Sequence, residues 1–350
     1  MRKPSTTSWS ACRATIPASA TPSVAPWSAS STGSDVRAAF IALLGAASTA
    51  GAAECIVPSK PGGAMDLTCK LVRDGLRQMP ETAQSPMRLS YAPGGIGAVA
   101  WHSLVSGRRG DGNTLVAFSG GSLLNLAQGK FGKAKPGDVR WVAALGADYG
   151  MIAVRGDSPF HSLADLVAAL KRDPAKVLIG VSGTIGSQDW LKMALLVRTA
   201  GIDPKVLRFV ALEGGGEAFT AMQANYVQVV SGDASEAHLM AANGKVRVLA
   251  VLSEQRLPGE LALVPTAREQ GYDVVWPTIR GVWMGPQASD ADYRRWVQTF
   301  DRMMASPDFA RLRTAAGLYP LTLTGPALTD YVQKAVDDYG KRASQLGLMR

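Results

Sequence analysis

The feature that most constrains the fold of this chain is a recurring unit: a short apolar strand, a glycine-rich loop and then a helix. The first unit places a strand at Cys55–Val57, a loop at Pro61–Gly63 and a helix over about Asp66–Met79. Similar units recur in residues 87–122 and 177–223. Alternation of this kind predicts an α/β fold with parallel strands.

The loops of these units are where we expect a ligand to bind. In parallel sheets, ligands collect outside the carboxyl ends of the strands, and each of these loops follows such an end. Gly62 and Gly63 leave the backbone open just before a helix N-terminus, which favours an anion such as a carboxylate. An ordinary connection, whose glycines only permit the turn, explains this stretch equally well.

Two sets of such units predict two lobes with a ligand cleft between them. The length of 350 residues allows two domains, and 47% hydrophobic and 19% charged residues make a core-forming composition. We assign residues 54–150 and 278–350 to lobe 1 and residues 151–277 to lobe 2. Separate strands are expected at Trp141–Leu145 and Met151–Val154, and the second of these should cross between the lobes.

Residues 1–53 are expected to be a leader. Residues 38–53 form a short apolar run that follows Arg37 and ends in small residues, which is the pattern of a signal peptide cleaved near Ala53. Residues 1–35 are rich in Ser, Thr, Ala and Pro, and we expect them to be disordered or, if Val36 is an alternative start, never translated. The leader predicts export to the periplasm.

The composition and motifs exclude several classes of function. The formal net charge is +9, but no Lys/Arg-rich run or aromatic patch follows the leader, so we expect no nucleic-acid partner. The three histidines are far apart, which argues against a metal site. No common hydrolase, P-loop, zinc-protease or redox-cysteine motif is present, so we expect no catalytic residues and no cofactor. The alternative is a nicotinamide-dependent oxidoreductase that uses the turn Gly95-Ile96-Gly97.

Several motifs follow one another in a specific order. They are Cys55, Pro61-Gly62-Gly63, Asp66, Cys69, Pro93–Gly97, Ser182–Ser187, Gly214–Ala218, Pro265–Tyr272 and Arg280-Gly281. In these motifs the chain resembles the Bug-type periplasmic substrate-binding receptors of tripartite tricarboxylate transporters. The resemblance implies a two-lobe periplasmic binding protein of the Venus-flytrap type, which closes about a hinge on a small carboxylate and delivers it to a membrane permease. We expect a monomer.

The resemblance also implies how the ligand is held. Backbone amides and bridging waters of two opposing loops, Pro61–Asp66 and Thr184–Ser187, would bind a carboxylate. Arg280 is expected either to bind a ligand carboxylate with two hydrogen bonds or to form a surface ion pair. Asp66 is expected either to cap the first helix or to contact the ligand. The expected ligand-binding residues are Pro61, Gly62, Gly63, Ala64, Met65, Asp66, Ser119, Gly120, Thr184, Ile185, Gly186, Ser187, Asp233 and Arg280.

Two further expectations concern the cysteines and the ligand. Once the leader is removed, Cys55 and Cys69 are the only cysteines, so we expect a disulfide, with two buried free thiols as the alternative. The paired cysteines resemble the tricarboxylate-binding branch, so we expect a di- or tricarboxylate, citrate-like first. Against this, Glu213 near the cleft would repel a third carboxylate unless it faces solvent or hydrogen-bonds a hydroxyl of the ligand. The sequence departs from the family at Ala64-Met65 and at Ala211–Glu213.

Overall fold

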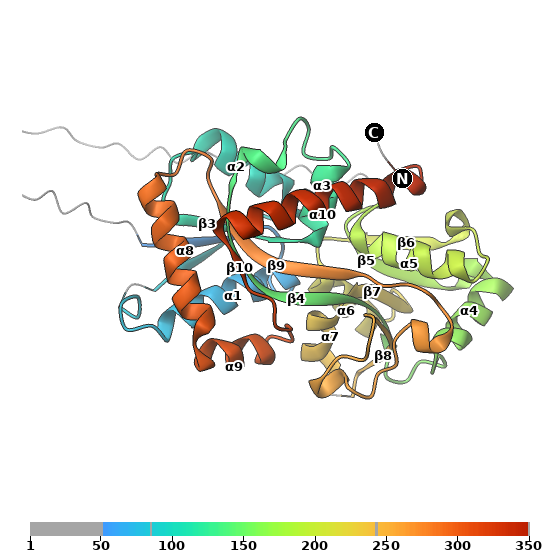
Figure 1. Cartoon of the computed structure of the whole chain (residues 1–350). Coiled ribbons are helices and arrows are strands. Elements are labelled where there is room, and N and C mark those ends of the chain that lie inside the picture. The colour runs from blue at the N-terminus through green and yellow to red at the C-terminus, as the bar shows by residue number, and fades with distance from the viewer. Residues whose placement is uncertain (1–51, 85, 242–243, 349–350) are drawn as a thin grey trace, which may run out of the picture. The chain divides into compact units, whose positions relative to one another are not determined.

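The computed structural model describes residues 52–84, 86–241 and 244–348 (Figure 1). Residues 1–51 of the expected leader lie outside the described residues. The strands are β1 (Glu54–Val57), β2 (Arg88–Tyr91), β3 (Thr114–Ser119), β4 (Arg140–Arg155), β5 (Leu178–Ser182), β6 (Arg208–Leu212), β7 (Val229–Asp233), β8 (Val246–Leu252), β9 (Pro277–Met284) and β10 (Leu323–Thr324). The α-helices are α1 (Ala64–Arg77), α2 (Ala98–Gly107), α3 (Gly120–Ala127), α4 (Leu163–Arg172), α5 (Gln188–Thr199), α6 (Gly215–Gln223), α7 (Ala234–Ala241), α8 (Asp290–Ala305), α9 (Pro307–Ala315) and α10 (Gly325–Gln345).

The strands form a mixed sheet in the order β2-β1-β3-β9-β4-β7-β5-β6, and β8 and β10 also pair with β4. Strand β1 runs parallel to β2 and β3, and β5 runs parallel to β6 and β7. The predicted α/β class with parallel strands is therefore confirmed in two groups of strands. The long antiparallel strands β4 and β9 lie between these groups and run side by side (Figure 1).

The expectation of two separate strands within residues 141–154 is wrong, because β4 continues through all of them for 16 residues. The glycines and polar residues between Gly146 and Gly150 look like a turn in sequence. Pairing with β9 keeps this backbone extended as far as Tyr149, which lies opposite Pro277. From Gly150 onward β4 pairs with β7 and β8 instead. One strand therefore belongs to both groups.

The glycine-bearing stretch Ser119–Ser122, at the end of the predicted unit in residues 87–122, is not a loop. Helix α3 begins at Gly120, and the Ser119 hydroxyl caps it by accepting a hydrogen bond from the Gly121 N–H at 3.2 Å. Glycine is needed at position 120 because a Cβ there would lie 2.2 Å from Oγ1 of Thr278 in β9. Close approach of the helix to β9, and not the geometry of a turn, explains this glycine.

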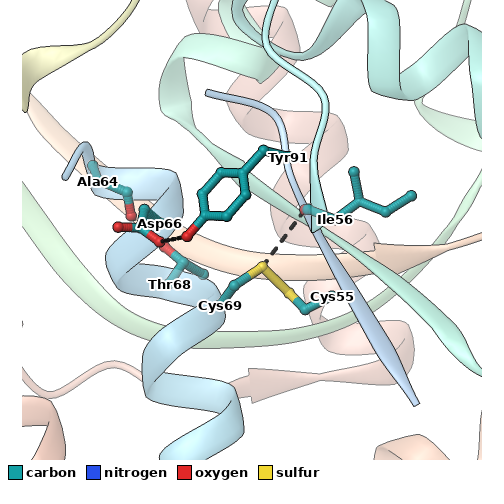
Figure 2. Close-up of a disulfide and its surroundings, with 7 residues drawn as sticks. All are labelled: Cys55, Ile56, Ala64, Asp66, Thr68, Cys69 and Tyr91. Carbon is teal, nitrogen blue, oxygen red and sulfur yellow. Dashed lines mark hydrogen bonds between the residues drawn. A yellow bond between two sulfur atoms is a disulfide. The ribbon is translucent and has the colours of Figure 1, made fainter. Parts of the chain in front are cut away.

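The first strand–loop–helix unit is fastened by the predicted disulfide, which is confirmed. Cys55 in β1 and Cys69 in α1 are bonded, with 5.7 Å between their Cα atoms, and both residues are fully buried (Figure 2). The bond joins the strand and the helix on either side of the loop at Pro58–Gly63. Around it, side chains of α1, α8 and α9 pack into an apolar core that includes Leu71, Phe300 and Phe309.

Removal of this disulfide should lower the stability of the protein. The two cysteines are 14 residues apart in sequence, and closing a loop of that length contributes on the order of 3 kcal/mol. We expect the double substitution Cys55→Ala, Cys69→Ala to lower the free energy of unfolding in denaturant by about this amount. Reductant should destabilise the wild type and leave the variant unchanged. Identical unfolding curves for the wild type with and without reductant would contradict the assignment.

Candidate functional site

A small cavity lies where the loops that follow the strands meet. Its volume is about 40 Å³, and we call it the Arg280 cavity. Its walls come from the β1–α1 and β6–α6 loops, the ends of β3, β5 and β7, the starts of α1, α5, α6 and α7, and strand β9. The lining residues are Pro58, Ser59, Gly63, Ala64, Met65, Ile96, Ser119, Ser182, Gln188, Asp189, Glu213, Gly214, Gly215, Asp233, Glu236 and Arg280.

A second cavity of about 270 Å³, which we call the Thr184 cavity, adjoins the first. Ile96 and Glu213 line both of them. Its lining residues are Gly95, Ile96, Ala98, Asn125, Lys130, Gly183, Thr184, Leu212 and Glu213. Glu213 is exposed to solvent, which is the condition under which it would not exclude an anionic ligand.

The structure brings together about half of the residues that were expected to bind the ligand. Those that line one of the two cavities are Gly63, Ala64, Met65, Ser119, Thr184, Asp233 and Arg280. Those that line neither are Pro61, Gly62, Asp66, Gly120, Ile185, Gly186 and Ser187. Gln188, Asp189 and Glu236 also line the Arg280 cavity but were not among the predicted residues. The sequence indicated them only by position: Gln188 and Asp189 directly follow the Ser182–Ser187 motif, and Glu236 stands three residues after Asp233.

The first helix N-terminus already carries a carboxyl group of the protein itself. Helix α1 begins at Ala64. Its N-cap residue, Gly63, has no side chain that could cap it. The Ala64 N–H donates a hydrogen bond of 2.8 Å to Oε1 of Glu236, a residue of α7 that is 5% exposed. Glu236 therefore occupies the position at which we expected the carboxylate of a ligand.

The same carboxyl group lies against the start of α6. A Cβ on Gly215 would come within 2.0 Å of Oε2 of Glu236, and a Cβ on Gly216 would lie 2.8 Å from the backbone of Gly62. Glycines at these positions let the start of α6 approach both Glu236 and the β1–α1 loop. The positive ends of two helix dipoles thus converge on this one carboxyl group.

Arg280 is held in a buried ion-pair cluster. It is 2% exposed, its Nε and Nη2 atoms donate to Oδ2 of Asp148 at 3.0 and 2.7 Å, and Nη2 also bonds Asp233. Lys192 is fully buried, donates to Oδ1 of Asp189 at 2.7 Å, and bonds Asp233 as well. The ion pair of Arg280 is therefore internal, which corrects the expectation of a surface pair.

The cations and burial set the protonation of these carboxyl groups. Burial would raise the pKa of Asp233, but Lys192 and Arg280 outweigh it and hold the pKa below its ordinary value. Burial opposes the charges of Lys192 and Arg280 too, yet the neighbouring carboxylates raise the pKa of both. For Glu236, burial and then repulsion by Asp233 raise the pKa to about 8. Burial likewise raises the pKa of Asp189. At neutral pH, Glu236 is therefore mostly protonated.

Two amide side chains in the cavity walls form hydrogen bonds through their nitrogen but not through their oxygen. Nε2 of Gln188 donates to Oδ2 of Asp233, and Nδ2 of Asn125 donates to the Gly95 carbonyl, both at 3.0 Å. The amide oxygens, Oε1 of Gln188 and Oδ1 of Asn125, are buried and have no hydrogen-bond partner among the described residues. Each is an acceptor for which the described part of the chain supplies no donor.

Asp66 holds the β1–α1 loop. It is fully buried, and its carboxylate accepts hydrogen bonds of 2.8 Å from the Gly62 N–H and the Tyr91 hydroxyl and pairs with Lys70 at 2.7 Å (Figure 2). The helix starts two residues earlier than predicted, so Asp66 lies in its first turn and bonds the loop before it. Ser187 likewise caps α5, its hydroxyl accepting from the Trp190 N–H at 3.3 Å. Both residues have structural roles.

The turn proposed for a dinucleotide, Gly95–Gly97, is a short 3₁₀ segment between β2 and α2. Its carbonyl oxygens accept hydrogen bonds from Asn125 and Ser122, and Gly95 and Ile96 line the Thr184 cavity.

Within the described residues, no group of three His, Cys, Asp or Glu side chains is arranged to hold a metal ion. None of the described helices is long and apolar enough to cross a membrane.

This fold, with cavities between its two groups of strands, defines a two-lobe binding protein. Residues 83–348 match the family described as "Tripartite tricarboxylate transporter family receptor" (TctC), and the chain belongs to this family. The resemblance stated from the motifs is confirmed. Proteins of this family are periplasmic solute-binding receptors and not enzymes, which favours the receptor class over the oxidoreductase alternative.

Individual relatives agree with this assignment. A UPF0065 protein of Bordetella pertussis is 22% identical over 319 residues, which cover 89% of this chain and 97% of the relative. The periplasmic binding protein BugD has a similar fold, with a TM-score of 0.76 at 19% identity, over 85% of this chain and 98% of BugD. MatC of Rhodopseudomonas palustris, solved with bound malate, gives a TM-score of 0.72 at 20% identity, over 83% and 98%.

The raised pKa of Glu236 predicts how stability changes with pH. The folded protein keeps a proton on this group up to about pH 8, whereas the unfolded chain releases it near 4.5. The stability that protonation provides is therefore present below pH 4.5 and is lost as the pH rises through 8. We expect Glu236→Gln to reduce the loss of unfolding free energy between pH 5 and 8 by at least about 1.4 kcal/mol, the value of one pKa unit.

Urea unfolding at both pH values measures this difference. Glu254→Gln is a matched control, because the Glu254 side chain is exposed and forms no ion pair with another described residue. This control should keep the pH dependence of the wild type. Parallel pH profiles for the wild type and Glu236→Gln would show that Glu236 is ionised in the folded protein.

Proposed function

We propose that this chain is a non-catalytic periplasmic receptor that captures a small carboxylate solute between its lobes and delivers it to the permease of a tripartite tricarboxylate transporter. Membership of the family supports the role and the partner. Export through the predicted signal peptide, and action as a monomer, belong to the same proposal. The dicarboxylate malate, bound to MatC, supports a carboxylate as the ligand class.

One observation carries the proposal: the starts of five helices lie at the Arg280 cavity. Its walls include Ala64 of α1, the α3 cap Ser119, Gln188 of α5, Gly215 of α6 and Asp233 just before α7. Helix N-termini carry partial positive charge, which favours an anionic solute nearby, although the Ala64 N–H is itself bonded to Glu236. Such a convergence provides binding energy without requiring a catalytic side chain.

The strand pairing supports closure about a hinge. Strand β4 changes its partners from β9 and β10 to β7 and β8 between Tyr149 and Gly150, and β9 begins at Pro277. These positions agree with the proposed lobes, residues 54–150 with 278–350 and residues 151–277. A solute that contacts both groups of strands would favour the closed state, since it gains more contacts there.

We place the carboxylate of the solute in the Thr184 cavity. Lys130 lines this cavity together with Gly183 and Thr184, so a cation and the start of a strand–helix loop face the same space. Charge-assisted hydrogen bonds to a carboxylate are the stronger kind. Of the expected loop Thr184–Ser187, Thr184 would therefore contribute most to binding the carboxylate.

A ligand screen tests the proposed function. Succinate, malate, adipate and citrate are each added to the purified full chain, with glucose as the neutral control, and the melting temperature is measured. A ligand at a hundred times its Kd should add about 2.7 kcal/mol to the stability. If none of the acids stabilises the protein more than glucose does, the proposed function is wrong.

Lys130→Met should weaken the binding of any acid that the screen identifies by about tenfold, as expected for the loss of one charge-assisted hydrogen bond. Lys133→Met is the matched control, because Lys133 is exposed three residues away and does not line the cavity. Calorimetry measures both affinities, and the melting temperatures of the unliganded variants separate a loss of binding from a loss of stability. Equal affinities for the two variants would contradict the placement in the Thr184 cavity.

A further inference from the structure

A groove lies on the surface where the ends of α5 and α10 meet (Figure 1). It consists of two cavities of about 610 and 430 Å³ that share Arg198 and Gln345, and we call it the Arg198 groove. Its walls come from the end of α5, the segment that follows α5, residues 273–275 before β9, and the end of α10. None of its lining residues lines the Arg280 cavity or the Thr184 cavity, so it is a separate place in the molecule.

The basic side chains of this groove are not neutralised by the chain. Arg198 and Lys205 are exposed, and neither forms an ion pair with another described residue. Arg342 makes no ion pair with a described acidic residue either, and its Nη1 donates only to the Val275 carbonyl, at 3.4 Å. Three cations therefore face the groove without a carboxylate partner.

The two acidic residues of the groove, by contrast, already have partners. Asp273 pairs with Arg268 at 2.7 Å. The Asp203 carboxylate accepts a hydrogen bond of 3.0 Å from the Lys205 N–H. The side chains of the groove thus leave positive charge available for a ligand.

A second, independent observation concerns Trp190, which lines the groove and is 7% exposed. Its ring packs on Phe209, with 5.7 Å between the ring centres. The indole Nε1 atom is buried and has no hydrogen-bond acceptor in the described part of the chain. An indole N–H can only donate, and buried polar groups are almost always paired. An acceptor from outside the chain would explain this atom.

The rest of the groove is largely apolar. Leu195, Val274 and Val275 line one cavity, and Ile202 and Leu346 line the other. Pockets for small molecules combine such apolar walls with a few polar groups that fix the orientation of the ligand. Helices α5 and α10 both end here, and helix C-termini carry partial negative charge. The backbone therefore does not favour an anion, and the side chains must hold it.

We propose that the Arg198 groove binds an anionic amphiphile, an alkyl carboxylate, whose head group accepts hydrogen bonds from Arg198, Lys205 and the indole N–H of Trp190. The alkyl chain lies on the apolar wall at Leu195 and Val274. All three polar groups are donors, and an ionised carboxylate only accepts, so the two sets match. The exposed Gln345 side chain bonds no other described residue, and it is the part of the wall that turns aside to open Nε1 of Trp190.

Three probes test the proposal by calorimetry on the full chain. They are octanoate, octanol, which has the chain without the charge, and butyrate, which has the charge with a short chain. We expect octanoate to bind at least about tenfold more tightly than either, because it alone gains both the charge-assisted hydrogen bonds and the burial of a long chain. Equal binding of octanol or of butyrate would overturn the proposal.

Variants of the groove identify the head-group site. Arg198→Met should weaken octanoate binding by about tenfold. Trp190→Phe keeps a ring against Phe209 but removes the N–H, and should weaken it by about fivefold. Arg172→Met is the matched control, because Arg172 is exposed, has no ion pair among the residues that the structure describes, and lies outside the groove.

The melting temperatures of the unliganded variants separate a loss of binding from a loss of stability. The octanoate affinities of Arg198→Met and Trp190→Phe are each compared with that of Arg172→Met. If neither groove variant binds octanoate more weakly than this control, the proposal is wrong.

The same titrations distinguish this groove from the proposed solute site. If Lys130→Met weakens octanoate binding and Arg198→Met does not, octanoate enters the Thr184 cavity. The groove proposal is then wrong while the receptor function stands. If octanoate binding depends on Arg198 and the acid screen fails, the groove stands and the proposed function is wrong.

Sedimentation with phosphatidylglycerol vesicles distinguishes a soluble amphiphile from a membrane lipid. We expect octanoate to bind in solution and the vesicles to retain no more protein than vesicles of phosphatidylcholine do. Retention by phosphatidylglycerol that Arg198→Met abolishes, without any binding of octanoate, would replace the soluble ligand by a membrane surface and overturn the proposal.

Discussion

The ion-pair cluster around Arg280 is the interaction on which the arrangement of the two groups of strands depends. Arg280 of β9 bonds Asp148 of β4 and Asp233 at the end of β7, and Lys192 of α5 extends the cluster to Asp189. All of these side chains are buried. Buried charges are costly unless each is paired, so a displacement of any one of these elements would leave a charge without its partner. The cluster therefore fixes the elements that form the cavity walls.

In the Arg280 cavity, carboxyl groups of the protein occupy a region that the fold makes suitable for an anion. The backbone brings helix N-termini together, which is an arrangement suited to anions. The side chains at positions 189, 233 and 236 are carboxylic acids, and Glu236 itself satisfies the first amide of α1. The family, which the fold identifies, therefore does not by itself decide what this cavity binds. The individual side chains decide it.

Part of the candidate site could be predicted because it follows local rules. Loops after strands bring Gly63, Ser119 and Asp233 to one edge of the sheet, where they line the Arg280 cavity. Gln188 and Glu236 were missed because each sits on a helix. Which face of a helix meets a cavity depends on the element packed against it, and the sequence of α7 gives no such information over only eight residues.

The sequence alone determined the class of the fold, the first strand–loop–helix unit and its disulfide. These features depend on contacts close along the chain, such as the 14-residue separation of Cys55 and Cys69. Only the tertiary structure decided that β4 is continuous, that Arg280 pairs internally, and that Glu236 reaches the N–H of Ala64 across 172 residues. Side-chain pairing over such separations depends on the order of strands in the sheet, and neither periodicity nor propensity contains that order.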